Sequence, residues 1–186
     1  MYKRKVIDRG ITWIGPKPKS IKSMGNKDIA RELALNSNIP ICPGINNVHK
    51  LSDEQLKTKC EAIGYPLLVK SSAGGGGIGM SVVQNFKDLA SAIEKTSNLA
   101  AKSFGNGDIF IEKFITNARH IEIQVFGFGA KGSVHLFERD CSMQRRYQKI
   151  IEESPAPEVD RELINNMAQA AVKLSSDVKY EGAGTV

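Results

Sequence analysis

The stretch LLVKSSAGGGGIGMSVV, residues 67–83, holds four consecutive glycines and a fifth at Gly79, with Lys70 shortly before them. Each glycine costs conformational entropy on folding, and a hairpin turn needs only one or two of them. The flanking residues 66–71 and 80–84 have the pattern of two strands. We therefore interpret the stretch as a hairpin whose loop donates backbone N–H groups to phosphate oxygens, while Lys70 supplies a positive charge. The alternative is a hairpin turn that binds nothing.

Three better-known phosphate loops do not fit this stretch. Gly74, Gly79 and Ser81 have the P-loop spacing, but Met80 stands where that loop requires a lysine. Gly74, Gly76 and Gly79 have the spacing of dinucleotide-binding folds, in which the motif must open a helix, whereas a strand pattern follows here. Protein kinases place the lysine on a later strand, whereas here it precedes the loop.

The composition is that of an ordinary globular protein. Of 186 residues, 41% are hydrophobic and 25% charged, and the net charge is +6. The cations are scattered along the chain, so we expect no nucleic-acid partner. The three cysteines have no paired spacing, which argues against a disulfide framework or a zinc site. Because no signal peptide or membrane-spanning run is evident, we expect a cytoplasmic protein with no membrane partner.

Capping signals and apolar spacing predict three of the helices. Ser52 and Gln55 form a capping box, so a helix should begin after Ser52. Asn85 is a candidate cap for a later helix, and the last helix should begin near Asp160. In the last helix we expect five apolar residues to face inward: Leu163, Ile164, Met167, Ala171 and Leu174.

Alternation of apolar and polar residues predicts strands over 108–114 and 120–126, with a partner strand over 134–138. A polar stretch then continues to Pro157 without a predicted element. Residues 183–186 have the pattern of a strand that has only begun. We therefore expect the chain to be a piece of a longer protein.

Two polar stretches are candidates for chemistry. In the first, Glu112 and Lys113 lie either beside a nucleotide base or on an exposed strand of mixed charge. The second, residues 138–157, would form an anion pocket if it is extended and a solvated basic loop if it is not; its cations are Arg139, Arg145, Arg146 and Lys149. Cys141 has no identifiable general base. The carboxylates show no metal-ligand spacing, so we predict no metal site within this chain.

Four stretches together resemble the biotin carboxylases of the ATP-grasp fold, from about Gly10 to the last residue. They are WIGPKPKSIKSMGNK, YPLLVKSSAGGGGIGM, FIEKFITNARHIEIQVFG and ERDCSMQRRYQKIIEESPAP. Within that family the chain looks most like the urea carboxylase part of urea amidolyase. The motifs ITWIGP and SFGNGDIFIEKFITNARH favour that subfamily, as does Ile78, where many acyl-CoA-type relatives carry arginine.

The resemblance implies a role for individual residues. Lys27 and Lys70 match lysines that contact ATP phosphates, and Lys149 matches a catalytic lysine near bicarbonate and the transferred phosphoryl group. The remaining ATP-binding positions are two loop glycines, a residue near the base, the hinge that reads adenine and residues lining the pocket: Gly76, Gly77, Met80, Glu112, Lys113, Phe114, Ile115, His120, Gln144 and Tyr147. Tyr147 stands where familiar relatives have histidine, so it can donate a hydrogen bond but cannot carry a positive charge.

The resemblance also implies the architecture, an α+β fold of ATP-grasp type that is truncated. Residues 1–41 would end the preceding subdomain and linker helix. Residues 42–113 would form the small lid with the glycine-rich loop, and residues 114–186 would begin the larger ATP-binding subdomain.

As a full-length protein we expect a ligase that uses ATP and bicarbonate to carboxylate biotin on a carrier domain and passes the carboxyl group to urea. Mg²⁺ ligands would lie beyond Val186, and the full-length protein could form a homo-oligomer. The rivals are another ATP-grasp ligase, of the carbamoyl-phosphate synthase or acyl-CoA/pyruvate carboxylase type, and a nucleotide-binding piece that is inactive alone. We expect the 186-residue chain alone to be inactive.

Overall fold

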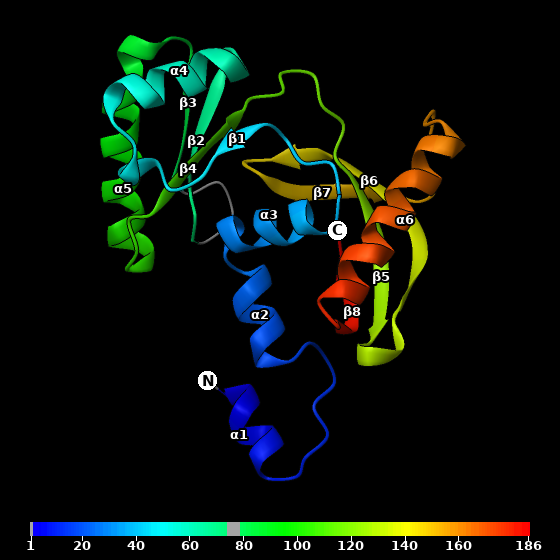
Figure 1. Ribbon diagram of the computed structural model, residues 1–186. Helices are drawn as coiled ribbons and strands as arrows, with labels where there is room; N and C mark the ends of the chain where they lie inside the picture. Colours follow the sequence, from blue (N-terminus) through cyan, green and yellow to red (C-terminus); the bar gives the residue numbers. More distant parts are fainter. Residues whose placement is uncertain (1, 74–78) are drawn as a thin grey trace. The chain divides into compact units, whose positions relative to one another are not determined.

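The computed structural model describes residues 2–73 and 79–186 (Figure 1). The loop residues Gly76 and Gly77, to which the resemblance gives a role over the phosphates, lie outside the described residues. Within the described part, no helix is both long and apolar enough to cross a membrane.

Contacts divide the chain into two compact units. The central unit comprises Gly25–Arg31 and Pro40–Ala118, and the C-terminal unit comprises Met1–Met24, Glu32–Ile39 and Arg119–Val186. The division into segments 1–41, 42–113 and 114–186 stays a prediction.

The helices and short 3-10 turns are α1 (Tyr2–Asp8), α2 (Pro18–Met24), α3 (Lys27–Asn36), η1 (Val48–Lys50), α4 (Asp53–Ile63), η2 (Phe86–Asp88), α5 (Leu89–Phe104), η3 (Gly129–Lys131) and α6 (Arg161–Asp177). The strands are β1 (Gly44–Ile45), β2 (Leu67–Ser71), β3 (Met80–Val83), β4 (Ile109–Lys113), β5 (Ile121–Phe128), β6 (Ser133–Arg145), β7 (Gln148–Glu153) and β8 (Glu181–Thr185).

The central unit contains an antiparallel sheet, sheet A, with strand order β1-β4-β2-β3. Alternate residues of each strand point to opposite faces. One face forms the core with α4 and α5, to which β2 contributes Leu67 and Val69 and the two helices contribute Cys60 and Leu89. Cys60 is a small core residue, since its side chain is fully buried.

The predicted capping box of α4 is present. The Ser52 hydroxyl accepts from the Gln55 N–H, and the Gln55 side chain accepts from the Ser52 N–H. At the next helix, the Asn85 side chain caps the 3-10 turn η2, which leads directly into α5. The helix after Asn85 therefore begins with one tighter turn.

The C-terminal unit contains a second antiparallel sheet, sheet B, with order β7-β6-β5-β8. Helix α6 packs on one face, where Ile123 and Val125 of β5 meet Ala168 and Ala171. Helix α6 begins just after Asp160, near the predicted start, and the Asp160 side chain caps it by accepting from the Glu162 N–H.

Two expectations about this unit are wrong. Leu163 is 52% exposed rather than inward-facing, because it lies at the edge of the helical stripe that Ile164 and Ala168 bury. The polar stretch that follows residue 138 is structured, because β6 continues to Arg145 and β7 pairs back against it. The pairing runs from Arg145 opposite Gln148 to Asp140 opposite Glu153, with shifts of register between them. The segment is extended, as the anion-pocket interpretation requires.

Candidate functional site

Three predicted site residues of the central unit, together with Phe110, belong to one face of sheet A. Lys70 pairs directly with Met80 on β3 and with Phe110 on β4, and Glu112 lies two residues beyond Phe110. Residues that face one another across antiparallel strands project on the same side. Lys70, Met80, Phe110 and Glu112 therefore share the face opposite α4 and α5, which we call the site face.

Two lysines converge at the end of β2. The Lys70 ammonium forms an ion pair with Glu112 Oε1 at 2.7 Å. Lys27, the first residue of α3, donates from Nζ to the Ser71 carbonyl at 3.0 Å, and its backbone N–H donates to Ser72 at 3.2 Å. Burial, and then the charge of Lys70, lower the pKa of Lys27. The positive charges of Lys27 and Lys70 therefore repel each other, and a bound anion would relieve this repulsion.

Two hinge residues after Glu112 make hydrogen bonds to the backbone within the central unit that the sequence did not predict. The Lys113 ammonium donates to the carbonyls of Gly64 and Tyr65, at 3.0 and 2.8 Å, at the end of α4. The Phe114 N–H donates to the Pro66 carbonyl at 3.1 Å. The Lys113 side chain therefore lies on the helix side of sheet A, and its role as an adenine-binding residue stays a prediction, as do those of Phe114 and the exposed Ile115.

Arg31 is a residue of this site that the sequence analysis missed. It follows Lys27 by one helical turn, and its Nη1 lies 3.7 Å from Glu112 Oε2. Phe110, which is 1% exposed, has both Arg31 and Lys70 within cation–π distance of its ring, at 5.8 and 5.4 Å. The helical spacing of Lys27 and Arg31 was a signal in the sequence. The ion-pair partner of Arg31, Glu112, lies too far along the chain to be found by spacing.

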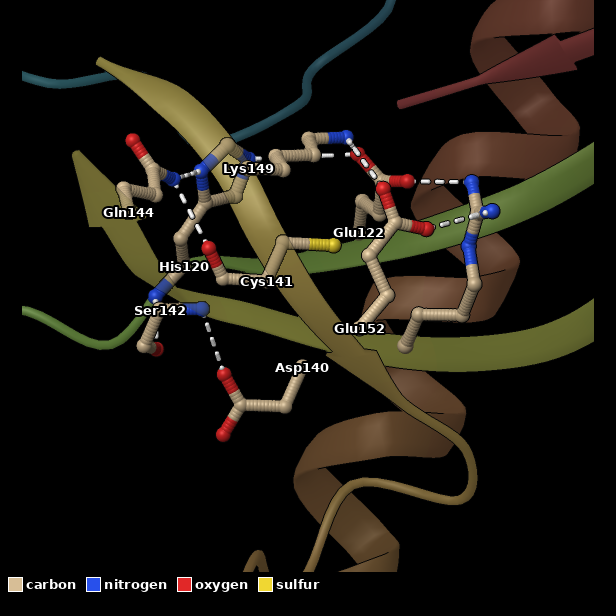
Figure 2. A network of polar contacts seen from close by, with 9 residues as sticks. His120, Glu122, Asp140, Cys141, Ser142, Gln144, Lys149 and Glu152 are labelled. Atoms are coloured by element: carbon tan, nitrogen blue, oxygen red, sulfur yellow. Dashed lines mark hydrogen bonds and ion pairs between the residues drawn. The ribbon is translucent and has the colours of Figure 1, made fainter. Parts of the chain in front are cut away.

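In the C-terminal unit, a second polar cluster spans three strands (Figure 2). Glu122 on β5, 5% exposed, receives hydrogen bonds from Arg139 on β6 and from Lys149 on β7. Arg139 also donates to Glu152 at 2.9 Å. One buried carboxylate thus holds two cations side by side, and one of them is the predicted catalytic lysine.

The pKa values follow from this arrangement. Burial alone would raise the pKa of Glu122, but the hydrogen bond from Lys149 and the charges of Arg139 and Lys149 outweigh it and lower the pKa. The same hydrogen bond raises the pKa of Lys149. Burial, and then Glu122, raise the pKa of the Cys141 thiol, so Cys141 is a poor nucleophile.

His120 and Gln144 are also brought together (Figure 2). Gln144 Nε2 lies 2.6 Å from His120 Nδ1 and 2.8 Å from the Cys141 carbonyl. The other ring nitrogen, His120 Nε2, lies 3.9 Å from Glu122 Oε2. Tyr147, at the tip of the β6–β7 hairpin, is 66% exposed with a positive φ of 63°. The structure does not join it to the cluster of Glu122 and Lys149.

Asp140 and Arg119 hold the segment that leads into β5, and His120 belongs to this segment. The Ser142 hydroxyl and then Arg119 lower the pKa of Asp140 to about 2. Arg119 also donates to the Pro157 carbonyl at 2.7 Å, while the His120 N–H donates to the Ser142 hydroxyl at 2.9 Å. These contacts hold the backbone on which His120 lies.

Among the described residues, Glu122, Cys141 and Glu152 place ligand atoms within 4.8 Å of one another. Both carboxylates already pair with Arg139 or Lys149. A metal ion would have to displace these cations, and a thiol is not among the oxygen ligands that Mg²⁺ takes. This set does not fit Mg²⁺.

Comparison with known proteins supplies the family. Residues 26–186 match the model of the carbamoyl-phosphate synthase L chain, ATP-binding domain. Biotin carboxylase 1 of Bacillus subtilis is 44% identical over 176 residues, which are 95% of this chain and 39% of that protein. The mitochondrial methylcrotonoyl-CoA carboxylase subunit alpha of Arabidopsis thaliana is 44% identical over 179 residues, 96% of this chain and 24% of that protein.

Solved structures agree. The crystal structure of a biotin carboxylase from Campylobacter jejuni, in a β,γ-ATP complex, matches with a TM-score of 0.90 and 39% identity, covering 99% of this chain and 41% of that one. The biotin carboxylase domain dimer of Hydrogenobacter thermophilus 2-oxoglutarate carboxylase, with MgADP, ADP and bicarbonate, matches with a TM-score of 0.88 and 39% identity, covering 99% and 40%. The chain thus spans about two fifths or less of these relatives.

These matches confirm the predicted fold, which is of ATP-grasp type with mixed helix and sheet. They do not name a urea carboxylase among the relatives described above. The chain belongs to the carbamoyl-phosphate synthase L chain ATP-binding domain family, and the relatives described above include biotin carboxylases.

Proposed function

We propose that this chain is the nucleotide-binding part of an ATP-dependent biotin carboxylase. The observation that carries the proposal is the convergence of Lys27 and Lys70 at the site face, next to the glycine-rich loop in sequence. Relatives whose structures hold ATP or ADP share the fold over 99% of this chain. ATP is therefore the ligand that we expect the two lysines to bind.

In this function the two lysines act by charge and position. A polyphosphate beside Lys27 and Lys70 would offset the repulsion that contributes to the lowered pKa of Lys27. Ammonium groups act on phosphate as point charges, which suits a tail that must be released after reaction. No covalent intermediate on the protein is needed, because phosphoryl transfer depends mainly on positioning and electrostatic stabilisation.

Lys149 is the residue that we assign to bicarbonate. In the proposed reaction, a bicarbonate oxygen attacks the γ-phosphorus of ATP, ADP leaves, and carboxyphosphate forms. Its carbon–oxygen bond to the phosphate then breaks to give carbon dioxide and phosphate. The biotin nitrogen on a carrier domain gives its proton to the phosphate and bonds to the carbon dioxide. Glu122 keeps Lys149 protonated, because it raises the pKa of that lysine. A charged Lys149 can hold an anion but cannot serve as a base. The ATP-binding roles that the resemblance implies for His120, Gln144 and Tyr147 are parts of the same proposal.

Mg²⁺ would neutralise the ATP phosphates during transfer. The cluster of Glu122, Cys141 and Glu152 does not fit it, so we place the metal ligands beyond Val186 in a longer protein. A biotin carrier domain, a cytoplasmic location, and the lack of a nucleic-acid or membrane partner are parts of the same proposal.

For the final acceptor of the carboxyl group we propose urea, on the strength of ITWIGP, SFGNGDIFIEKFITNARH and Ile78. Pyruvate and acyl-CoA acceptors have equal support, because pyruvate and methylcrotonoyl-CoA carboxylases are among the relatives. A carbamoyl-phosphate synthase-type reaction remains a further rival. The decisive test is ATP hydrolysis by the full-length protein with bicarbonate and each acceptor in turn. Stimulation by pyruvate but not by urea would overturn the urea assignment.

The nucleotide proposal itself is tested on the 186-residue chain by calorimetric titration with ATP. Lys70→Ala removes one charge-assisted contact, for which about 1.5–3 kcal/mol is typical, so affinity should fall roughly 10- to 150-fold. Lys57→Ala is the matched control, since Lys57 is an exposed lysine of α4 in the same unit. Equal affinities of Lys70→Ala and the unaltered chain would refute the role of Lys70.

An assay of bicarbonate-dependent ATP hydrolysis tests the remaining alternative, that the chain alone binds nucleotide but is inactive. We expect the chain to bind ATP without turnover, because the proposed metal ligands lie elsewhere. Appreciable turnover by the chain alone would refute that expectation and would strengthen the assignment of Lys149.

A further inference from the structure

The Glu112 carboxylate lies between two cations and uses a different oxygen for each. Oε1 is 2.7 Å from Lys70 Nζ, and Oε2 is 3.7 Å from Arg31 Nη1. The three side chains are 13–21% exposed, so solvent screens them less than it screens a surface pair. Glu112 therefore fixes the direction of Lys70, while Arg31 offsets the negative charge that Glu112 brings.

Arg31 is itself held in place. Its Nη2 donates to the Cys42 carbonyl at 2.9 Å, and its guanidinium group lies over the Phe110 ring. Gly44 leaves the room for this approach, because a Cβ there would lie 2.7 Å from Arg31 Nη2. A planar group fixed on three sides in a half-buried setting is suited to positioning a neighbour.

The charge balance shows why an anion site needs Arg31. Without it, the Glu112 carboxylate would have Lys70 as its close ion-pair partner on the site face, and one of the two phosphate-binding lysines would be neutralised. With it, the cations Lys27, Lys70 and Arg31 outnumber the nearby carboxylates of Glu112 and Asp28, and the cluster keeps a net positive charge.

We propose that Arg31 is a positioning residue for polyphosphate binding: it binds one oxygen of Glu112, so that Glu112 orients Lys70 without cancelling its charge. The inference rests on the proposed nucleotide site and adds a residue to it. Arg31 acts through Glu112 and Lys70 and does not itself contact the ligand.

The test compares ATP with AMP, which lacks the β- and γ-phosphates, by competition against a fluorescent nucleotide. Arg31→Met removes the charge and the fork of donors. We expect roughly tenfold weaker ATP binding, about 1.4 kcal/mol, and a change in AMP binding below about twofold. Arg31→Lys restores the charge and should recover part of the loss. Raising the salt concentration should shrink the difference between Arg31→Met and the unaltered chain.

A second variant tests the route through Glu112. In a Glu112→Gln background the negative charge that Arg31 offsets is gone, so Arg31→Met should weaken ATP binding by less than about threefold. An Arg31→Met effect of the same size in both backgrounds would overturn the proposed route. So would an equal loss of ATP and AMP binding, which is the pattern of a merely structural arginine.

Arg161→Met is the matched control, because it also removes an arginine from an arginine–glutamate pair, Arg161 with Glu138 at 2.6 Å. It should lower the melting temperature without changing the ratio of ATP to AMP affinity. If Arg31→Met lowers the melting temperature, affinities are measured well below it. An unaltered chain that binds no ATP would overturn the proposed function and this inference with it, whereas normal binding by Arg31→Met would overturn the inference alone.

Discussion

Replacing Glu122 by glutamine should destabilise the C-terminal unit, and the loss should depend on pH. The substitution keeps the size of the side chain but leaves Arg139 and Lys149 with the more exposed Glu152 as their shared counter-charge. Removing one partner of a fully buried pair costs about 3–5 kcal/mol. Both cations are 32% exposed, so water takes over part of the lost interaction and we expect about 1–3 kcal/mol at pH 7.

The pH dependence follows from the lowered pKa of Glu122. Its usual value is 4.5, and the folded value lies below that. A carboxyl of this kind contributes stability that is fully present above the unfolded pKa and is lost as the pH falls through the folded pKa. Because glutamine does not titrate, the difference in unfolding free energy between the unaltered chain and Glu122→Gln should shrink as the pH falls from 7 towards about 3.

Urea unfolding followed by tryptophan fluorescence measures this difference. Trp13 is the single tryptophan, and it belongs to the same unit as Glu122. Glu153→Gln is the control, since Glu153 is an exposed residue of β7. A difference below about 0.5 kcal/mol at pH 7, or one that stays constant down to pH 3, would refute the reasoning, because an ordinary surface substitution behaves that way.

Two smaller changes test the central unit. Gly44→Ala should lower the free energy of unfolding by about 1–3 kcal/mol, because the added Cβ would lie 2.6 Å from the Ile111 carbonyl of β4 and 2.7 Å from Arg31 Nη2. An unchanged melting temperature would contradict this. Lys113→Met should lower the free energy of unfolding by about 1–2 kcal/mol, because the carbonyls of Gly64 and Tyr65 lose a charged donor. Amide hydrogen exchange at the end of α4 should become faster, and unaltered exchange there would contradict the importance of this contact.

Local signals were sufficient where a residue's partner lies nearby in the sequence. The capping box of Ser52 and Gln55 and the strands on either side of the glycine loop were predictable, since each depends on neighbours within a few positions. The register of those strands follows from the hairpin, and it places Met80 opposite Lys70.

What the sequence could not supply were the partners of charged residues. Arg31 and Glu112 are 81 positions apart, and Glu122 and Lys149 are 27 apart. No periodicity connects such pairs. Glu122 alternates with apolar residues like an ordinary exposed strand residue, and it is buried only because two other strands bring cations to it. The strand β7 was missed for a related reason, since every one of its residues is exposed and its composition is polar.

Lys70 and Glu112 lie on neighbouring strands, and both side chains project from the site face because side chains alternate along each strand. Inserting a single residue into β4 ahead of Ile111 would turn Ile111 towards the site face and push the Glu112 carboxylate among the apolar side chains of α4 and α5. A substitution alters one side chain, whereas an insertion or deletion within this strand would exchange interior for exterior in one step.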